Sequence, residues 1–131
     1  MSVGILIITH SNIGKSLCDA VVSVLGTSPL TVKTLPVSLD CDPEQLVAQA
    51  HTIIKTLDQG DGVLVLTDMY GSTPSNIACK LSNTMVKVVA GVNLPMLVRI
   101  MNYPKLDLQQ LTDKAVSGGH EGVIPCSPAK H

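Results

Sequence analysis

The sequence predicts an α/β protein whose mainly parallel, doubly wound sheet has four strands and carries helices on both faces. Short apolar runs rich in β-branched residues recur at residues 3–9, 30–35, 62–67 and 85–90. Longer segments with apolar residues at helical spacing lie between these runs. Strands that alternate with helices form βαβ units, in which both faces of a parallel sheet are covered. We therefore expect one compact domain over residues 1–131.

The expected helices between the strands have recognisable starts and stops. They begin near Ile13, Pro43 and Pro74. Proline is favoured in the first turn of a helix, and Asp42 and Thr73 stand just before the two prolines as N-caps. Gly26 and Gly60 follow the first two helical segments, and glycine commonly ends a helix.

The segment after the fourth strand is expected to contain two more helices, over residues 95–101 and 106–116. Gly118 and Gly119 then break the helical pattern and form a flexible hinge. Beyond this hinge, residues 122–126 are predicted to form one last short strand.

Composition excludes several classes of function. The formal net charge is -1, so the chain has no basic surface for nucleic acid. The apolar stretch at residues 3–9 is too short to span a bilayer and lacks the basic start and cleavage site of a signal peptide. We therefore expect a cytoplasmic protein that does not insert into membranes.

The cysteines predict no metal site. Cys18, Cys41, Cys79 and Cys126 form no C-x-x-C pair, and no histidine lies beside them at a spacing typical of metal ligands. In a reducing compartment we interpret these thiols as small apolar fillers of the core.

The candidate site lies where the strands end, because ligands of doubly wound sheets gather beyond the carboxyl ends of the strands. His10 follows the first strand and Asp68 the third, and Gly91 to Asn93 follow the fourth. A neutral imidazole is a competent nucleophile, and a carboxylate bonded to its other ring N–H would fix the reactive tautomer. His10 and Asp68 fit these two catalytic roles.

The helix start at Pro74 supplies a place for phosphoryl oxygens, because its first N–H groups are unpaired and its dipole is positive there. Gly71, Ser72 and Thr73 lie where this cradle would form. Such a transfer needs no metal, nucleotide or other cofactor.

Each of these residues taken alone has a plainer interpretation. A histidine after a strand is more often a hydrogen-bonded loop residue than a nucleophile, and Ser72 and Thr73 also suit a turn and a cap. The Gly14-Lys15-Ser16 triplet lacks the earlier glycine of a P-loop, so we assign Lys15 and Ser16 to the first helix. The other histidines are expected in a partly exposed helical position, a Gly-rich turn and the terminus, at His51, His120 and His131.

Three longer segments carry a family resemblance over nearly the whole chain. They are Ile5-Leu-Ile-Ile-Thr-His10, Gly62-Val-Leu-Val-Leu-Thr-Asp68-Met-Tyr-Gly-Ser-Thr-Pro74-Ser-Asn76 and Ala90-Gly-Val-Asn-Leu-Pro-Met-Leu97, together with the ending Gly118-Gly-His-Glu-Gly-Val123. In these segments the chain resembles the mannose-class IIA component of the phosphoenolpyruvate-dependent sugar phosphotransferase system. The family usually has two glycines before its Ser/Thr-Pro, whereas this chain has Gly71-Ser72-Thr73-Pro74.

The resemblance implies a phosphocarrier. His10 would accept a phosphoryl group from phospho-HPr and pass it to a IIB component, while Asp68 orients the ring. The resemblance also implies a homodimer in which residues 122–126 are exchanged between subunits, although an edge strand within one chain would suit them equally. The chain contains no region resembling IIB, so we expect the acceptor to be a separate protein.

Three alternatives remain open on the sequence. One is a regulatory module whose phosphorylation state is read by another protein and that has no direct role in sugar transport. Another is a non-covalent binder of a small phosphorylated ligand at the same strand ends. The third is the phosphoryl donor subunit of dihydroxyacetone kinase, which also begins with a strand and a His-Ser pair, although the Gly91-Val-Asn-Leu-Pro-Met96 segment favours the mannose class.

Overall fold

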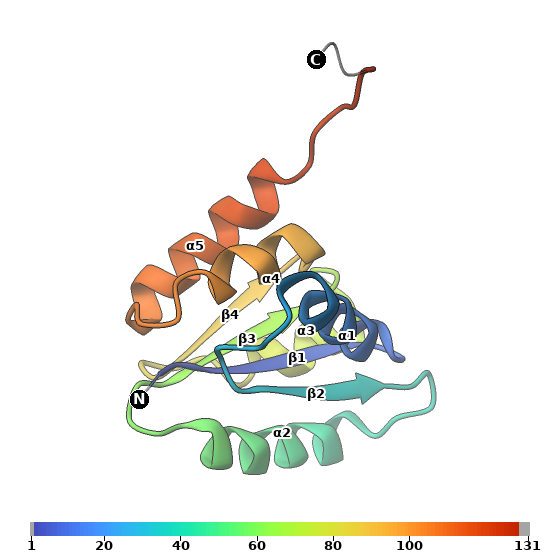
Figure 1. The fold of residues 1–131 in the computed structure, drawn as a ribbon. Helices are drawn as coiled ribbons and strands as arrows, with labels where there is room; N and C mark the ends of the chain where they lie inside the picture. The colour runs from blue at the N-terminus through green and yellow to red at the C-terminus, as the bar shows by residue number, and fades with distance from the viewer. Residues whose placement is uncertain (1, 129–131) are drawn as a thin grey trace.

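Four parallel strands form one sheet in the order β2-β1-β3-β4 (Figure 1). The structure is a computed structural model and describes residues 2–128. The elements, in chain order, are β1 Gly4–His10, α1 Ile13–Leu25, β2 Val32–Val37, α2 Pro43–Leu57, β3 Val63–Thr67, α3 Thr73–Cys79, β4 Val86–Ala90, α4 Leu94–Met101 and α5 Leu108–Glu121. The predicted four-stranded doubly wound sheet is therefore confirmed.

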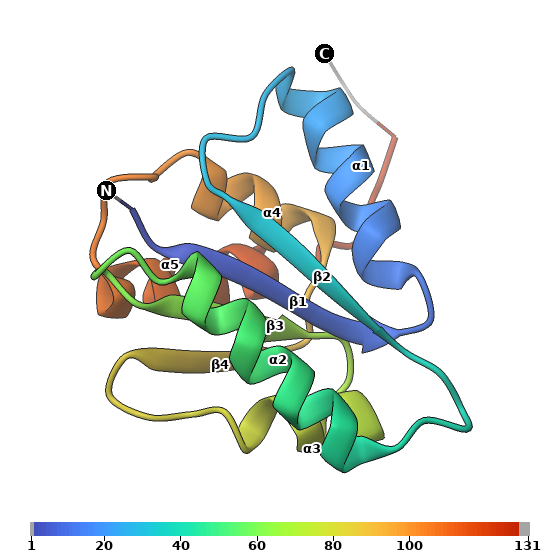
Figure 2. The ribbon, with the colours of Figure 1, turned by 90° about the horizontal axis from the view of Figure 1, so that it is seen from below.

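Helices cover both faces of the sheet (Figures 1 and 2). On one face, α1, α4 and α5 bury alternate residues of the strands, among them Ile7 and Leu66. On the other face, α2 and α3 bury the intervening residues, among them Ile8 and Val65. All five residues of β3 are buried, as are the first six of β1, so the two central strands form the core that fixes the site.

The helix starts confirm one predicted cap and correct the other. The Asp42 side chain accepts the Glu44 N–H at 3.1 Å, as an N-cap does. At α3 the cap is Ser72, not Thr73 as the sequence suggested, and Thr73 is the first helical residue. The reason is the left-handed Gly71, with φ of 85°, which turns the chain one residue earlier than expected.

The expected break at the two glycines near the C-terminus is wrong. Helix α5 runs through Gly118 and Gly119, both of which are buried against α4. A Cβ on Gly118 would lie 2.5 Å from the Arg99 Cβ, and one on Gly119 would lie 2.9 Å from the Met96 Cε. These glycines therefore serve close packing of two helices instead of forming a hinge.

The predicted last strand over residues 122–126 is absent from the described part of this single chain. Gly122 caps α5, and residues 123–128 leave the body of the molecule without regular structure (Figure 1). Within residues 2–128, no strand neighbours the outer edge of β4. Residues 123–128 follow the end of α5 and form no strand along that edge.

The cysteines are only partly core fillers. Cys18 and Cys41 are half-buried against the two apolar clusters, whereas Cys79 and Cys126 are exposed, contrary to the prediction. Burial raises the pKa of the Cys18 thiol, and the charge of Asp19 raises it further, so this thiol stays protonated. Within residues 2–128, no helix combines the length and apolar character needed to cross a bilayer.

Candidate functional site

The site forms where the winding of the sheet reverses. The chain passes from β1 outward to β2 and then returns across β1 to β3, so the carboxyl ends of β1 and β3 are adjacent. His10 is the last residue of β1 and Asp68 directly follows β3. This topology brings together two residues that lie 58 positions apart in the sequence.

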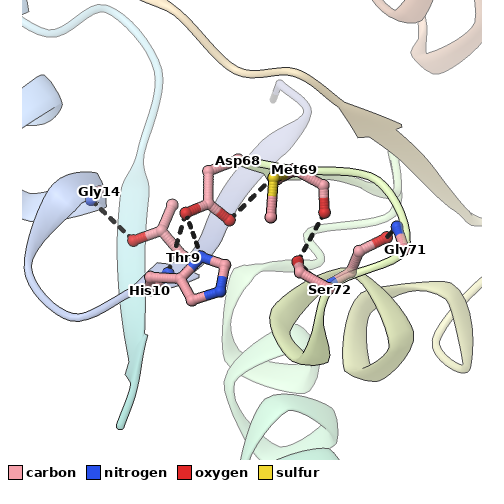
Figure 3. Close-up of polar contacts among 8 residues, drawn as sticks. Thr9, His10, Gly14, Asp68, Met69, Gly71 and Ser72 are labelled. Carbon is pink, nitrogen blue, oxygen red and sulfur yellow. Dashed lines mark hydrogen bonds and ion pairs between the residues drawn. The ribbon is translucent and has the colours of Figure 1, made fainter. Parts of the chain in front are cut away.

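Asp68 holds His10 through two contacts to one carboxylate oxygen (Figure 3). Its Oδ2 lies 2.7 Å from the His10 Nδ1 and accepts the His10 backbone N–H at 3.0 Å. Its Oδ1 accepts the N–H of Met69 at 3.1 Å. The Asp68 side chain is 13% exposed, whereas the His10 side chain is 39% exposed. The carboxylate is thus largely covered while the ring remains open to solvent.

These contacts determine the charge of the carboxyl group. Burial of Asp68 acts to raise its pKa, but the hydrogen bonds from the His10 ring and backbone, together with the charge of His10, outweigh burial and hold the pKa below its ordinary value. Asp68 is therefore ionised near neutral pH and is only an acceptor. Since it accepts from Nδ1, the neutral His10 ring carries its proton on Nδ1 and leaves Nε2 with a free lone pair. Nε2 lies on the side of the ring turned away from Asp68 (Figure 3).

The loop after Asp68 contains the three residues expected to hold phosphoryl oxygens. The N–H of Gly71 donates to the Ser75 Oγ at 3.3 Å, and the N–H of Ser72 donates to the Met69 carbonyl oxygen at 3.3 Å. The Ser72 hydroxyl also donates to that carbonyl. Among residues 2–128 the Thr73 N–H meets no acceptor, which leaves Thr73 as the unpaired donor at the start of α3.

Residues 91–93 lie at the same edge but have structural contacts. The N–H groups of Gly91 and Val92 both donate to the Thr67 carbonyl oxygen, at 2.9 and 3.0 Å. The Asn93 side chain caps α4 by accepting the Met96 N–H and donates to the Gly119 carbonyl oxygen at 3.1 Å. The strand ends therefore meet as predicted, but within residues 2–128 only the Asp68 side chain is hydrogen-bonded to His10.

Sequence reasoning missed two side chains that shape this edge. Buried Ser75 accepts the Gly71 N–H, and buried Thr9 accepts the Gly14 N–H at 2.8 Å. Both are small hydroxyl residues within five positions of their donor, and this spacing is the signal that would have indicated them.

Of the remaining histidines, the structure describes His51 and His120. His51 is exposed on α2, as expected, whereas His120 lies in α5 and not in a Gly-rich turn. His131 is outside the described residues. Lys15 and Ser16 belong to α1, as predicted. Within residues 2–128 no three His, Cys, Asp or Glu side chains gather where they would hold a metal ion.

The His10 ring lies on an open surface. A cavity of about 590 Å³ lies between α1 and β2 and is not lined by His10 or Asp68. Large apolar side chains in the neighbouring loops are exposed instead: Leu39 is 104%, Met69 59% and Tyr70 82% exposed. The loops at residues 10–12, 38–42, 68–72 and 91–93 contain three aspartates and no lysine or arginine. This surface suits a macromolecular partner better than an enclosed small ligand.

Comparison with known proteins identifies a family of phosphotransferase components. The sequence profile of the family described as "PTS system fructose IIA component" matches residues 4–116. Over 129 residues the chain is 31% identical to the "PTS system mannose-specific EIIAB component" of Escherichia coli strain K12. That alignment covers 94% of this chain and 39% of the other protein, so the chain spans about two fifths of the length of this relative.

A second relative and a solved structure extend the comparison. The "Transcriptional regulatory protein LevR" of Bacillus subtilis strain 168 is 27% identical over 115 residues, which are 83% of this chain and 12% of that protein. The mannose/sorbose specific IIA subunit from Enterococcus faecalis superposes with a TM-score of 0.86 at 20% identity, over 100% of this chain and 99% of that chain. At this identity the superposition shows the shared fold alone.

Replacing Asp68 by asparagine should remove a pH-dependent part of the stability. Because the folded-state pKa of Asp68 lies below 3.8, its ordinary value, the carboxylate stabilises the fold fully above that pH and loses this contribution as the pH falls through the folded-state pKa. The free energy of unfolding of the wild type minus that of Asp68→Asn should therefore shrink between about pH 5 and pH 2. Urea denaturation at several pH values measures this difference, and a constant value across the range would contradict the account.

Proposed function

The chain belongs to the PTS system fructose IIA component family, in its mannose class, and on that premise we propose that it carries phosphoryl groups on the Nε2 atom of His10. The contact of 2.7 Å between the Asp68 Oδ2 and the His10 Nδ1 carries this proposal. A histidine on an open surface with an ionised carboxylate behind it is arranged to accept a group and release it again.

The reaction needs little beyond positioning and charge compensation. The Nε2 lone pair attacks phosphorus in line, so that an N–P bond forms while the bond from phosphorus to the donor atom breaks. The ring becomes an imidazolium, whose positive charge lies directly against the Asp68 carboxylate. Transfer to the acceptor is the reverse sequence, and the neutral ring with its proton on Nδ1 is restored.

The start of α3 is the proposed site for the phosphoryl oxygens. Thr73 contributes the unpaired N–H, and the positive end of the helix favours the negative charge. Gly71 and Ser72 shape this phosphate-binding loop: their own N–H groups are engaged within it, and the left-handed Gly71 sets the turn that brings Thr73 to the edge. The Ser72 hydroxyl reaches a phosphoryl oxygen by turning from the Met69 carbonyl.

The partners in this proposal are proteins in the cytoplasm. Phospho-HPr donates the group, and a IIB component accepts it for sugar phosphotransfer. Exposed Leu39, Met69 and Tyr70 offer apolar contact beside His10. The four surrounding loops contain no lysine or arginine, which favours a partner that brings cations to the phosphoryl group. The name of the E. coli relative, an EIIAB component, supports a IIB acceptor.

A regulatory role is the second candidate, supported by the similarity to the transcriptional regulatory protein LevR over 115 residues. In that case phosphorylated His10 would change which protein binds the exposed surface, and no group would be passed on. Incubating the phosphorylated chain with purified IIB distinguishes the two roles. Loss of the phosphoryl group to IIB supports the carrier, and its retention supports the regulator.

His10→Gln should abolish phosphorylation, since glutamine keeps a polar side chain of similar length but has no nucleophilic nitrogen. Intact-mass spectrometry at mildly alkaline pH, after incubation with phosphoenolpyruvate, enzyme I and HPr, measures the added group. We expect one acid-labile phosphoryl group on the wild type and none on His10→Gln. The matched control is His51→Gln, which removes an exposed histidine on α2 and should leave phosphorylation intact. A phosphoryl group retained by His10→Gln would contradict the proposal.

The proposal includes a homodimer in which the tail of one chain adds a strand to the open edge of β4 in the other. Val116, Val123 and Ile124 are exposed, and a groove of about 320 Å³ beside β4 is lined in part by Val89 and Val123. Unpaired strand edges recruit further strands readily. Light scattering should therefore give a dimer for the full chain and a monomer for a chain ending at Gly122. A full-length monomer, or a truncated dimer, would overturn this arrangement.

A further inference from the structure

The His10 turn, residues 10–13, is closed by the buried hydroxyl group of Thr9. This hydroxyl group takes no part in the proposed transfer reaction. Thr9 is 1% exposed, and its Oγ1 accepts the Gly14 N–H at 2.8 Å (Figure 3). Gly14 is the second residue of α1, and the N–H at this position is normally bonded by the N-cap side chain. Asn12 occupies the N-cap position and makes no such bond. Thr9 therefore caps α1 from the other side of the His10 turn.

The turn needs this hydrogen bond because its backbone is strained. Ser11 has φ of 48°, and no other non-glycine residue within 2–128 has a positive φ. A residue of this kind keeps its conformation only where its surroundings hold it. The Ser11 N–H donates to the Val37 carbonyl oxygen at 3.0 Å, and the His10 N–H donates to Asp68 at 3.0 Å. The hydrogen bond from the Gly14 N–H to the Thr9 Oγ1 is the third restraint, and it links the two ends of the turn.

The packing of α1 on β1 makes this bond available. A Cβ on Gly14 would lie 3.0 Å from the Ile7 Cγ2 and 3.3 Å from the Thr9 Oγ1, so the helix backbone rests directly against the strand. The side chains of Ile7 and Thr9 share the face of the sheet toward α1, whereas the neighbouring residue His10 points to the opposite side. Holding Thr9 in place therefore also holds the backbone of His10, the next residue of β1.

We propose that Thr9 is a positioning residue for phosphoryl transfer: its bond from Gly14 keeps the His10 turn in the conformation that holds the ring against Asp68. The effect on transfer rate rests on the proposed function, whereas the effect on the contact between His10 and Asp68 does not. Without the Thr9 hydroxyl, Ser11 relaxes toward negative φ and the His10 backbone N–H and ring leave the carboxylate together.

The chain offers a matched control at Thr67. This residue ends β3 and directly precedes Asp68, as Thr9 directly precedes His10. It is 0% exposed, and its Oγ1 has no hydrogen-bond partner within residues 2–128. Valine has nearly the shape of threonine without the hydroxyl. Thr9→Val therefore removes the bond to Gly14, whereas Thr67→Val removes a buried hydroxyl that forms no bond.

The test compares wild type, Thr9→Val, Thr9→Ser and Thr67→Val in two measurements. One is the rate of phosphoryl transfer from phospho-HPr, and the other is the pKa of Asp68 from carbon NMR of its carboxyl group. Thr9→Val should slow transfer roughly tenfold and raise the pKa of Asp68 toward its ordinary value, because the hydrogen bonds from His10 weaken. Thr9→Ser keeps the hydroxyl and should restore both values, and Thr67→Val should leave both as in wild type.

Several outcomes overturn the proposal. One is a Thr9→Val variant whose transfer rate and Asp68 pKa equal those of the wild type. Another is a Thr67→Val variant in which both quantities change as much as in Thr9→Val. A third is a Thr9→Ser variant in which the transfer rate or the Asp68 pKa differs from that of the wild type. If wild type accepts no phosphoryl group at all, the proposed function fails, and the Asp68 pKa alone then decides the role of Thr9.

If Thr9→Val does not fold, hydrogen exchange of backbone amides in the wild type provides a second test. The Gly14 N–H should exchange slowly, whereas the N–H groups of Ile13 and Lys15 have no acceptor within residues 2–128 and should exchange fast. Equal exchange of the three amides would show that the bond from Gly14 to Thr9 is not maintained in solution and would overturn the proposal.

Discussion

The contact between the Asp68 carboxylate and His10 is the interaction on which the site depends. It spans the two central strands at the point where the sheet reverses its winding, so it exists only when β1 and β3 pair in register. Its two hydrogen bonds reach the backbone and the ring of the same residue, which fixes both the position and the tautomer of the imidazole. The proposed nucleophile, its charge compensation and its direction of approach all follow from this one contact.

The surroundings of this contact suit exchange between proteins. The ring is partly exposed, the cavity between α1 and β2 does not include it, and the neighbouring loops expose apolar side chains without lysine or arginine. An enclosed site would shield a phosphoryl group from water but would also exclude a protein partner. In the proposed transfer, an open site with an ionised carboxylate leaves the remaining charge compensation to the partner, so that the reacting groups come together only when the two proteins meet.

The sequence predicted the sheet and most helix starts, because these depend on local periodicity. It also predicted the pairing of His10 with Asp68, because parallel strands end at one edge of a sheet. It failed where the outcome depends on tertiary packing. Gly118 and Gly119 looked like a hinge, but contact with α4 makes small residues necessary inside α5. The cap of α3 shifted from Thr73 to Ser72 because Gly71 adopts a left-handed conformation that no spacing rule specifies. The free Nε2 likewise followed only from the hydrogen-bond geometry.

The most direct test of the central claim is to determine which ring nitrogen of His10 carries the phosphoryl group. Nitrogen and phosphorus NMR of the phosphorylated chain, labelled with ¹⁵N in its histidines, distinguishes the two positions by the coupling between phosphorus and the ring nitrogens. The account predicts a phosphoryl group on Nε2, with Nδ1 still protonated and bonded to Asp68. A phosphoryl group on Nδ1 would contradict it, because that nitrogen is the one that Asp68 holds.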